Sequence, residues 1–416
     1  MNSLYMAYRN IFRNKRRSFF TLMSIIIGIA GLVIFQGFIQ NQMVQFRQSV
    51  VQGGLGHIQV ASRSEYFLKG EYNPFDYILP HALDLDHSLS KIEHVKAVTP
   101  MLGFTGLAAS SQKTISLLFK AFPVNEPLFA TQNTKRSDPT RVLLLGRLGS
   151  GTQLSEAVPN GVIIGKKAAE ILKVNVGDVI TVMGMQSGGG MNGIDMQVVG
   201  IYKGATTSEK YFAYTSYSLA KSFLAVDGPS AYLLSLDNLC NTDIVAQGLV
   251  NTKYADNPHF TVRKWTDLAV YYRQVNTMYT SFLTVIRSIL LLVILFVIVN
   301  TQTMSVMERM REIGTLRALG TTRLQVMTTF MFEGALLGTI GSVLGVILGF
   351  ILSWIFNLMG GLPMVYDGET VYNFFTPDVL GMFPNIWPVI LFALMGSILP
   401  ARKAGKLLIA ETLRFI

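Results

Sequence analysis

The residues best suited to chemistry are few, and they form no catalytic pattern. Gly161 to Lys167 looks like a phosphate-binding loop, but only three residues separate its glycines, where four are needed. Lys167 also stands where a serine or threonine would bind magnesium. A strand that ends before a short helix explains the segment better. We therefore predict no ATP site in this chain.

A metal centre and a hydrolase site are also poorly supported. The histidines lack the ligand spacing of known zinc sites. Neither a Gly-x-Ser-x-Gly nucleophile motif nor a His-Glu-x-x-His helix is present. Cys240 is the only cysteine, which excludes an intrachain disulfide. We predict no catalytic residue, no metal ligand and no cofactor bound by this chain. The histidines are His57, His81, His87, His94 and His259.

The most informative polar segment is Met307 to Gly320. Its residues favour a helix, and Ile313, Leu316, Arg317 and Gly320 fall at i, i+3, i+4 and i+7. The flanking charges make this predicted helix amphipathic, so it could lie along a membrane surface. A solvated loop that only carries positive charge is the alternative.

The chain contains four apolar stretches that are each long enough to cross a bilayer. A hydrocarbon core of about 30 Å needs roughly 20 helical residues. Half of the 416 residues are hydrophobic and 14% are charged, which is too apolar for a soluble protein of this length. The first stretch is longer than a signal-peptide core and lacks a cleavage site, so we interpret it as an uncleaved anchor. We predict transmembrane helices at residues 18–40, within 279–304, at 326–358 and at 380–400.

Arg287 lies near the start of the second span. An arginine is costly at the bilayer centre but tolerable near an interface. We therefore expect this helix to project outward from the membrane as a stalk, so that residues 279–304 contain both the stalk and the span.

Positive charge flanks the spans and predicts their orientation. The formal charge of +10 is concentrated before the first span, between the second and third, and after the fourth, whereas Gly360 to Pro384 has no Lys or Arg. By the positive-inside rule, both termini (1–17 and 401–416) and the 305–325 loop are cytoplasmic, and 41–278 and 359–379 lie outside. This distribution argues against a nucleic-acid partner. The flanking residues are Arg9, Arg13, Lys15, Arg16, Arg17, Arg309, Arg311, Arg317, Arg323, Arg402, Lys403, Lys406 and Arg414.

Residues 41–278 predict a large α+β extracytoplasmic domain inserted between transmembrane helices 1 and 2 of a four-helix membrane protein. Short β-rich runs alternate there with helical segments, and the length suffices for its own core, in one domain or two subdomains. We predict that Gln186 to Gly193 is a flexible loop. The predicted strands are 57–61, 95–99, 114–121 and 177–183, and the predicted helices are 166–172, 218–224 and 244–254.

Glycines at four-residue spacing mark the third span as a packing helix. Small residues on one face let another helix approach closely, either within the chain or from a second subunit. The general abundance of glycine in membrane helices is the alternative. The glycines are Gly334, Gly338, Gly341, Gly345 and Gly349.

The sequence resembles the FtsX-like, MacB-type ABC transporter permeases, and in layout the lipoprotein-releasing subunits LolC and LolE. Asn300 to Gly334 resembles the family signature, centred on Arg311 to Gly320. Leu399 to Ala404 and Glu411 to Arg414 resemble its C-terminal ending. The stretches that resemble its outer, MacB-like domain are Gly146 to Arg147, Val162 to Gly165, Ala168 to Ala169 and Val176 to Ile180.

The resemblance implies a permease without its own ATPase in the bacterial inner membrane, with its large domain periplasmic. A cytoplasmic ABC ATPase dimer would bind ATP and Mg, and a second permease subunit, identical or homologous, would complete the transporter. ATPase closure would move the membrane helices, and the stalk would carry the movement outward, which is called mechanotransmission. The coupling-helix residues implied are Arg311, Glu312, Ile313, Gly314, Leu316, Arg317, Ala318, Leu319 and Gly320.

Chain length favours a lipoprotein-releasing permease, because MacB carries a fused ATPase. In LolC an apolar hook captures a periplasmic carrier, and the comparable loop here has Met185 and Met191 but no aromatic residue. A lipoprotein substrate and a periplasmic carrier or adaptor are therefore open partners. The alternatives are a tripartite exporter of small molecules or peptides, and a signal-transmitting regulator of an extracytoplasmic hydrolase.

Overall fold

A computed structural model of the chain describes residues 9, 13, 15–70, 72–79, 85–124, 148–202, 211–251, 260–366 and 369–406. It divides into two compact units, one of residues 1–44 and 276–416 and one of residues 45–275. Several predicted features lie outside the described residues, namely His81, Gly146, Arg147, His259 and 411–414.

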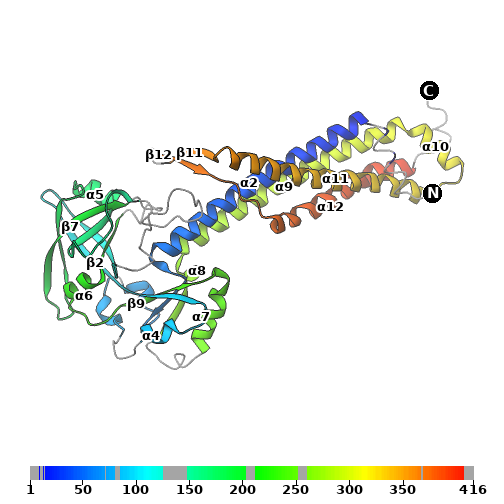
Figure 1. The fold of residues 1–416 in the computed structure, drawn as a ribbon. Coiled ribbons are helices and arrows are strands. Elements are labelled where there is room, and N and C mark those ends of the chain that lie inside the picture. The colour runs from blue at the N-terminus through cyan, green and yellow to red at the C-terminus, as the bar shows by residue number, and fades with distance from the viewer. Residues whose placement is uncertain are drawn as a thin grey trace. The chain divides into compact units, whose positions relative to one another are not determined.

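The first unit is built from long helices. Among the described residues, four helices are long and apolar enough to cross a membrane. They extend beyond the predicted spans, because the first continues to Val50 and the second already begins at Val270. Figure 1 labels the elements, which are α2 (Lys15–Val50), α9 (Val270–Glu308), α10 (Met310–Ala318), α11 (Arg323–Leu358), β11 (Leu362–Tyr366), β12 (Glu369–Asn373) and α12 (Val379–Lys406).

Apolar side chains from three of these helices form one core. The core brings together Ile29 of α2, Ile298 of α9 and Ala393 of α12, each at most 1% exposed. A Cβ on Gly396 of α12 would meet the Leu295 carbonyl oxygen of α9 at 3.1 Å, so these two backbones approach closely. Lipid provides no hydrophobic drive between helices, so close packing of this kind holds them together.

An aromatic cluster ties the helix ends near β11 and β12 together. Phe375 contacts the rings of Phe38 (6.0 Å) and Phe356 (5.4 Å). Asn357 donates to the Phe375 carbonyl and accepts from its amide at 2.7 and 2.8 Å. Asn385, 2% exposed, donates to Gln36 of α2 at 2.9 Å. This end of the helical unit is therefore fixed by specific contacts.

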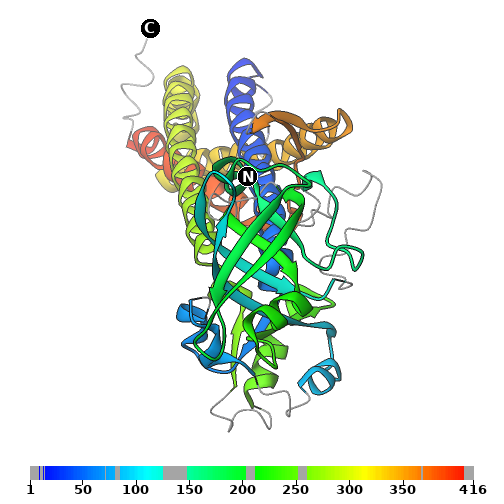
Figure 2. The same cartoon turned by 90° about the vertical axis from the view of Figure 1, so that its left-hand side faces the viewer.

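Six strands of the second unit close into a barrel. β2 pairs with β3 and β6, and the ring is completed through β8, β5 and β7. Its interior contains Phe104 stacked on Phe119, with ring centroids 4.9 Å apart. Figure 2 faces these strands. The elements are β2 (Val95–Ala109), β3 (Thr114–Phe122), β5 (Gly161–Gly165), α5 (Lys166–Leu172), β6 (Val179–Met185), β7 (Met191–Tyr202), β8 (Phe212–Ser216) and α6 (Tyr217–Leu224), with β4 (Leu148–Gly151) beside β7.

The first half of the long strand β2 belongs to a second sheet. There it pairs with β9, in the order β10-β1-β9-β2, and β1 lies antiparallel to both its neighbours. Leu89 of α4 and Leu249 of α7 pack in one cluster with Ile58 and Leu234 of this sheet. The elements are β1 (Ile58–Ala61), α3 (Tyr66–Lys69), α4 (Leu85–Ser90), β9 (Ala231–Leu236), α7 (Thr242–Asn251), β10 (Thr261–Lys264) and α8 (Trp265–Leu268).

The predicted strands and helices of this unit are confirmed, with shifted ends. The loop predicted at 186–193 does connect two strands, but it is shorter than predicted, because β7 already begins at Met191. Met185 pairs with Met191 across the hairpin, and the Gln186 amide donates to the Gly190 carbonyl at 2.8 Å. The glycines allow this turn, since Gly189 has a φ of +79°.

Candidate functional site

The predicted coupling segment forms a short helix between two long ones. α9 ends at Glu308, and Arg309, with φ −107° and ψ 15°, breaks the helix before α10 begins. Past Ala318 the chain turns through Gly320, whose φ of +96° lies in the left-handed region that favours glycine. Thr322 and Gln325 then form a capping box that starts α11. Leu319 and Gly320, predicted as part of the helix, therefore lie beyond its end.

α10 packs one side on the helical unit and exposes the other. Ile313 and Gly314 are buried, and Ile313 lies in a cluster with Val306 of α9, Phe330 of α11 and Ala404 of α12. The predicted face of Ile313, Leu316, Arg317 and Gly320 is therefore packed at Ile313 but exposed at Gly320. Leu316 and Arg317 are half-buried, while Arg311, Glu312, Thr315, Ala318, Leu319 and Gly320 are exposed.

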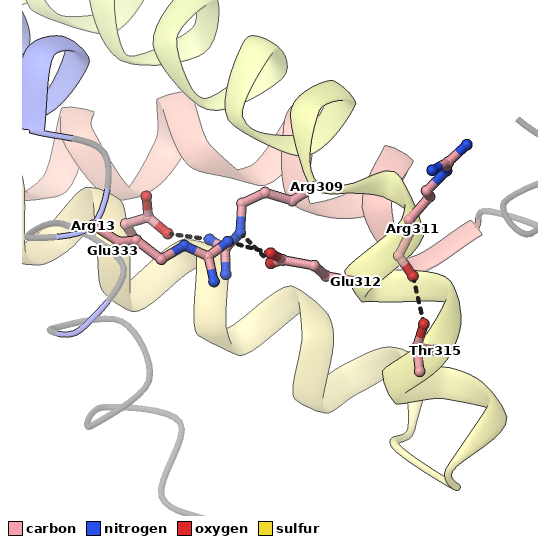
Figure 3. A network of polar contacts seen from close by, with 6 residues as sticks. All are labelled: Arg13, Arg309, Arg311, Glu312, Thr315 and Glu333. Atoms are coloured by element: carbon pink, nitrogen blue, oxygen red, sulfur yellow. Dashed lines mark hydrogen bonds and ion pairs between the residues drawn. The ribbon is translucent and has the colours of Figure 1, made fainter. Parts of the chain in front are cut away.

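Arg309 is the centre of a charged network at this helix junction. Its Nε donates to Glu312 Oε2 at 3.2 Å, and its Nη1 lies 3.7 Å from Glu333 Oε2 (Figure 3). The guanidinium also lies over the Phe330 ring at 5.8 Å. Glu333 is only 5% exposed and is the one acidic residue of α11. This buried carboxylate joins α11 to the α9–α10 junction.

The amino-terminal segment joins the same network. Arg13 forms an ion pair with Glu312, and Arg17 of α2 with Glu308 at the end of α9. Burial alone would raise the pKa of Glu312, but hydrogen bonds from Arg13 and Arg309 outweigh it, and that pKa is lowered. Glu312 therefore stays ionised and bound to two cations. Sequence analysis missed this network, although a lone carboxylate within the apolar run of α11 already calls for a cation.

The five glycines of α11 contact two helices of the same chain. A Cβ on Gly338 would lie 2.7 Å from Ala393 Cβ, and Gly334 likewise faces Ser397 of α12. The other three face α2, where added Cβ atoms would meet Ile25, Ile29 and Val33 at 2.6 to 2.7 Å. Because Gly341 follows Gly338 by three positions, not four, the two groups of glycines face two neighbouring helices.

The other residues singled out from sequence lie apart from this site. Gly161 to Gly165 is the buried strand β5, followed by α5, as predicted for a strand before a helix. His57 accepts from the Leu236 amide at 3.1 Å, and His94 pairs with Asp237 at 3.0 Å. Cys240 is an exposed free thiol. In the described part of the chain, no group of three or more His, Cys, Asp or Glu side chains could hold a metal ion.

Comparison with known families accounts for both units. The family model described as MacB-like periplasmic core domain matches residues 18–251, more than half of the chain. The model described as FtsX-like permease C-terminal matches residues 284–409, which include α10 and α11.

Individual relatives support the same family assignment. The chain is 24% identical over its whole length to the uncharacterized ABC transporter permease YknZ of Bacillus subtilis, covering 99% of that protein. It is 24% identical to the lipoprotein-releasing system transmembrane protein LolC of Haemophilus influenzae, over 74% of this chain and 81% of LolC. It is also 24% identical to the macrolide export ATP-binding/permease protein MacB of Campylobacter jejuni, over 96% of this chain but only 59% of MacB. The chain is a multi-pass membrane protein of the FtsX-like ABC transporter permease family and carries a MacB-like periplasmic core domain.

Proposed function

We propose that this chain is a non-catalytic permease subunit that converts ATP hydrolysis by a separate ABC ATPase into release of a lipoprotein from the outer leaflet. The observation that carries the proposal is the connection of α9 to α10. α9 is one helix of 39 residues, about 58 Å at 1.5 Å per residue, and only Arg309 separates it from α10. A movement of α10 therefore acts directly on a long, stiff helix.

The charged network connects α10 and the end of α9 to the neighbouring helices. Glu312 and Arg309 link α10 to Glu333 of α11, and Arg17 links the end of α9 to α2. In the proposed orientation these contacts lie at the cytoplasmic face, with α2 and α9 as the first two spans and the domain of residues 45–275 held outside between them. ATPase closure on the exposed side of α10 would then displace α9 first.

The exposed side of α9 suits both a second permease subunit and acyl chains. Met278, Phe282, Val285, Ile289, Leu292 and Phe296 repeat at alternating spacings of four and three, and each is 46 to 69% exposed. In lipid such a stripe can face hydrocarbon or pack on another apolar helix. An acylated protein leaving the bilayer along this stripe accounts for its lack of polar groups.

Reconstitution tests the substrate. The chain, co-purified with its ATPase in proteoliposomes, is offered a triacylated lipopeptide or the same peptide without acyl chains. We expect at least a threefold rise in ATP hydrolysis with the acylated probe only. Equal response to both peptides would contradict lipoprotein release, and stimulation by a macrolide alone would favour the second candidate, export, which the similarity to MacB supports.

A charge swap tests the coupling site. In R311E/E312R the contacts of Glu312 with Arg13 and Arg309 become repulsive, and exposed Arg311 changes sign. We expect the ATPase to be lost from the purified complex. Retention of the ATPase would show that α10 is not the docking helix, whatever the substrate. A swap of exposed Lys167 and Glu170 in α5, a pair at 2.8 Å, is the matched control.

A further inference from the structure

Arg287 is a charged residue of α9 for which the described part of the chain supplies no acceptor. Its Nε is shielded from solvent and makes no hydrogen bond. Arg17 and Arg309, at the opposite end of the helical unit, differ because both pair with carboxylates. A half-buried guanidinium whose Nε is shielded and which has no anion beside it among the described residues is unfavourable in a membrane protein, so an acceptor is expected.

The position of Arg287 on the helix directs it into the unit. Leu291, Ile294 and Ile298 form the buried face of α9, and Arg287 lies one turn before Leu291 on this face. Next to it, Leu290 packs against Gly28 of α2. The guanidinium is therefore held at the end of a packed seam, half-buried, and not displayed on the free side of the helix.

The depth of Arg287 follows from three helices independently. Arg17 and Glu308 pair at one end of the unit, where Glu333 pairs with Arg309. Twenty-one residues along a helix span about 31 Å. This count leads from Arg17 to Phe38 in α2, from Glu308 back to Arg287 in α9, and from Glu333 to Trp354 in α11. Phe38 belongs to the aromatic cluster, and Trp354 is 64% exposed, as is usual for tryptophan at a membrane interface. If the charged pairs mark one edge of a hydrocarbon core about 30 Å thick, Arg287 lies at the other edge, next to the headgroup layer that contains the lipid phosphates.

Protein carboxylates do not fill the role of acceptor in the described residues. α2 and α12 contain no Asp or Glu, and the acidic residue of α9 is Glu308 at its far end. Asp378, just before α12, lies at a similar depth but is engaged in contacts of its own. The described residues of these helices therefore leave the acceptor position open.

We propose that Arg287 binds the phosphate of one phospholipid molecule, seated at the outer end of the seam between α2 and α9. A guanidinium holds phosphate through two parallel hydrogen bonds, which a lysine ammonium cannot reproduce. The half-buried position makes this lipid a bound component, unlike the bulk lipids that any interfacial arginine meets. The inference rests on the placement of the helices in a bilayer and is independent of the substrate released.

Native mass spectrometry of the full-length chain in detergent tests this site. Dioleoylphosphatidylglycerol is titrated, with phosphate-free dioleoylglycerol as the headgroup control. We expect one phosphatidylglycerol per chain, at least tenfold weaker binding in R287Q, and an intermediate loss in R287K. R273Q is the matched control, because Arg273 is exposed on the same helix, fourteen residues earlier, and should bind like the unmodified chain.

Several results would overturn the proposal. Equal binding of dioleoylglycerol by the unmodified chain would exclude the phosphate, and this comparison stands even if R287Q does not fold. Unchanged binding in R287Q would place the lipid elsewhere. Competition by millimolar inorganic phosphate as effective as by the lipid would assign the site to free phosphate. Replacement of the lipid by a second copy of the chain would assign the acceptor to a partner carboxylate.

Discussion

Two carboxylates at the α10 end of the helical unit differ in burial, and their substitution should therefore have different effects. Glu333 is 5% exposed and pairs with Arg309, whereas the Glu308 side chain that pairs with Arg17 is 51% exposed. Removing one partner of a buried pair leaves an uncompensated charge, whereas an exposed pair is screened by water. Loss of Glu333 should therefore lower the free energy of unfolding more than loss of Glu308.

E333Q should destabilise the chain by about 3 kcal/mol, the lower end for a broken buried pair because Glu312 still faces Arg309. E308Q should cost about 0 to 1 kcal/mol. Unfolding in mixed micelles with increasing SDS measures both. Equal effects of the two substitutions would show that burial does not govern this network.

His57 and His94 should give opposite pH dependences. Burial, then the charge of Arg47, lowers the pKa of His57, so its contribution to stability is present above its unfolded value of about 6.5 and is lost as the pH falls. The hydrogen bond to Asp237 raises the pKa of His94, so its contribution is present below about 6.5 and is lost as the pH rises through the folded value.

Thermal unfolding between pH 8 and pH 5 tests these signs on the full-length chain. Relative to the unmodified protein, H57Q should lose less stability on acidification, and H94Q should lose more. Identical pH profiles for the two variants would contradict the assignment.

Among the helices, α11 carries the packing of the unit, because its two glycine groups contact α12 and α2. These contacts occur within the chain, so this face is not free for a second subunit. The sequence pattern predicted close packing but left the partner open, since spacing defines a face and not the helix opposite it. The partner depends on tertiary structure that local periodicity does not contain.

G345A should destabilise the helical unit by about 1 to 3 kcal/mol, the usual range for overpacking. Its Cβ would lie 2.7 Å from Ile29 Cβ and 3.0 Å from the Ile26 carbonyl oxygen. G31A in α2 is the matched control, because nothing lies within 4 Å of the added atom, and it should be neutral or slightly stabilising. Unfolding in SDS compares them, and equal stability losses would refute close packing at Gly345.

The outer domain shows which part of a fold is accessible from sequence. β3 and α5 were predicted because apolar periodicity and turn residues are local signals. Barrel closure was not predicted, because it depends on β6 pairing with β2, a contact between distant segments. The charged network was not predicted for the same reason, since Arg13 and Glu312 are 299 residues apart.

For the whole molecule, the central question is which side of the membrane each part faces. The charge distribution predicts cytoplasmic termini and an outer domain of residues 41–278, and the proposed coupling mechanism requires this orientation. Cys240 and Leu319 are suited to test it, since the first is a free, exposed thiol of the outer domain and the second is 80% exposed just after α10.

A membrane-impermeant maleimide applied to spheroplasts should label the unmodified chain at Cys240 without permeabilisation. C240S should remain unlabelled, because Cys240 is the only cysteine. C240S/L319C should become labelled only after detergent is added, in cells that lack the partner ATPase, so that docking does not shield the site. Labelling of L319C in intact spheroplasts would reverse the orientation and remove α10 from the compartment where ATP is bound, and with it the proposed direction of force from α10 into α9.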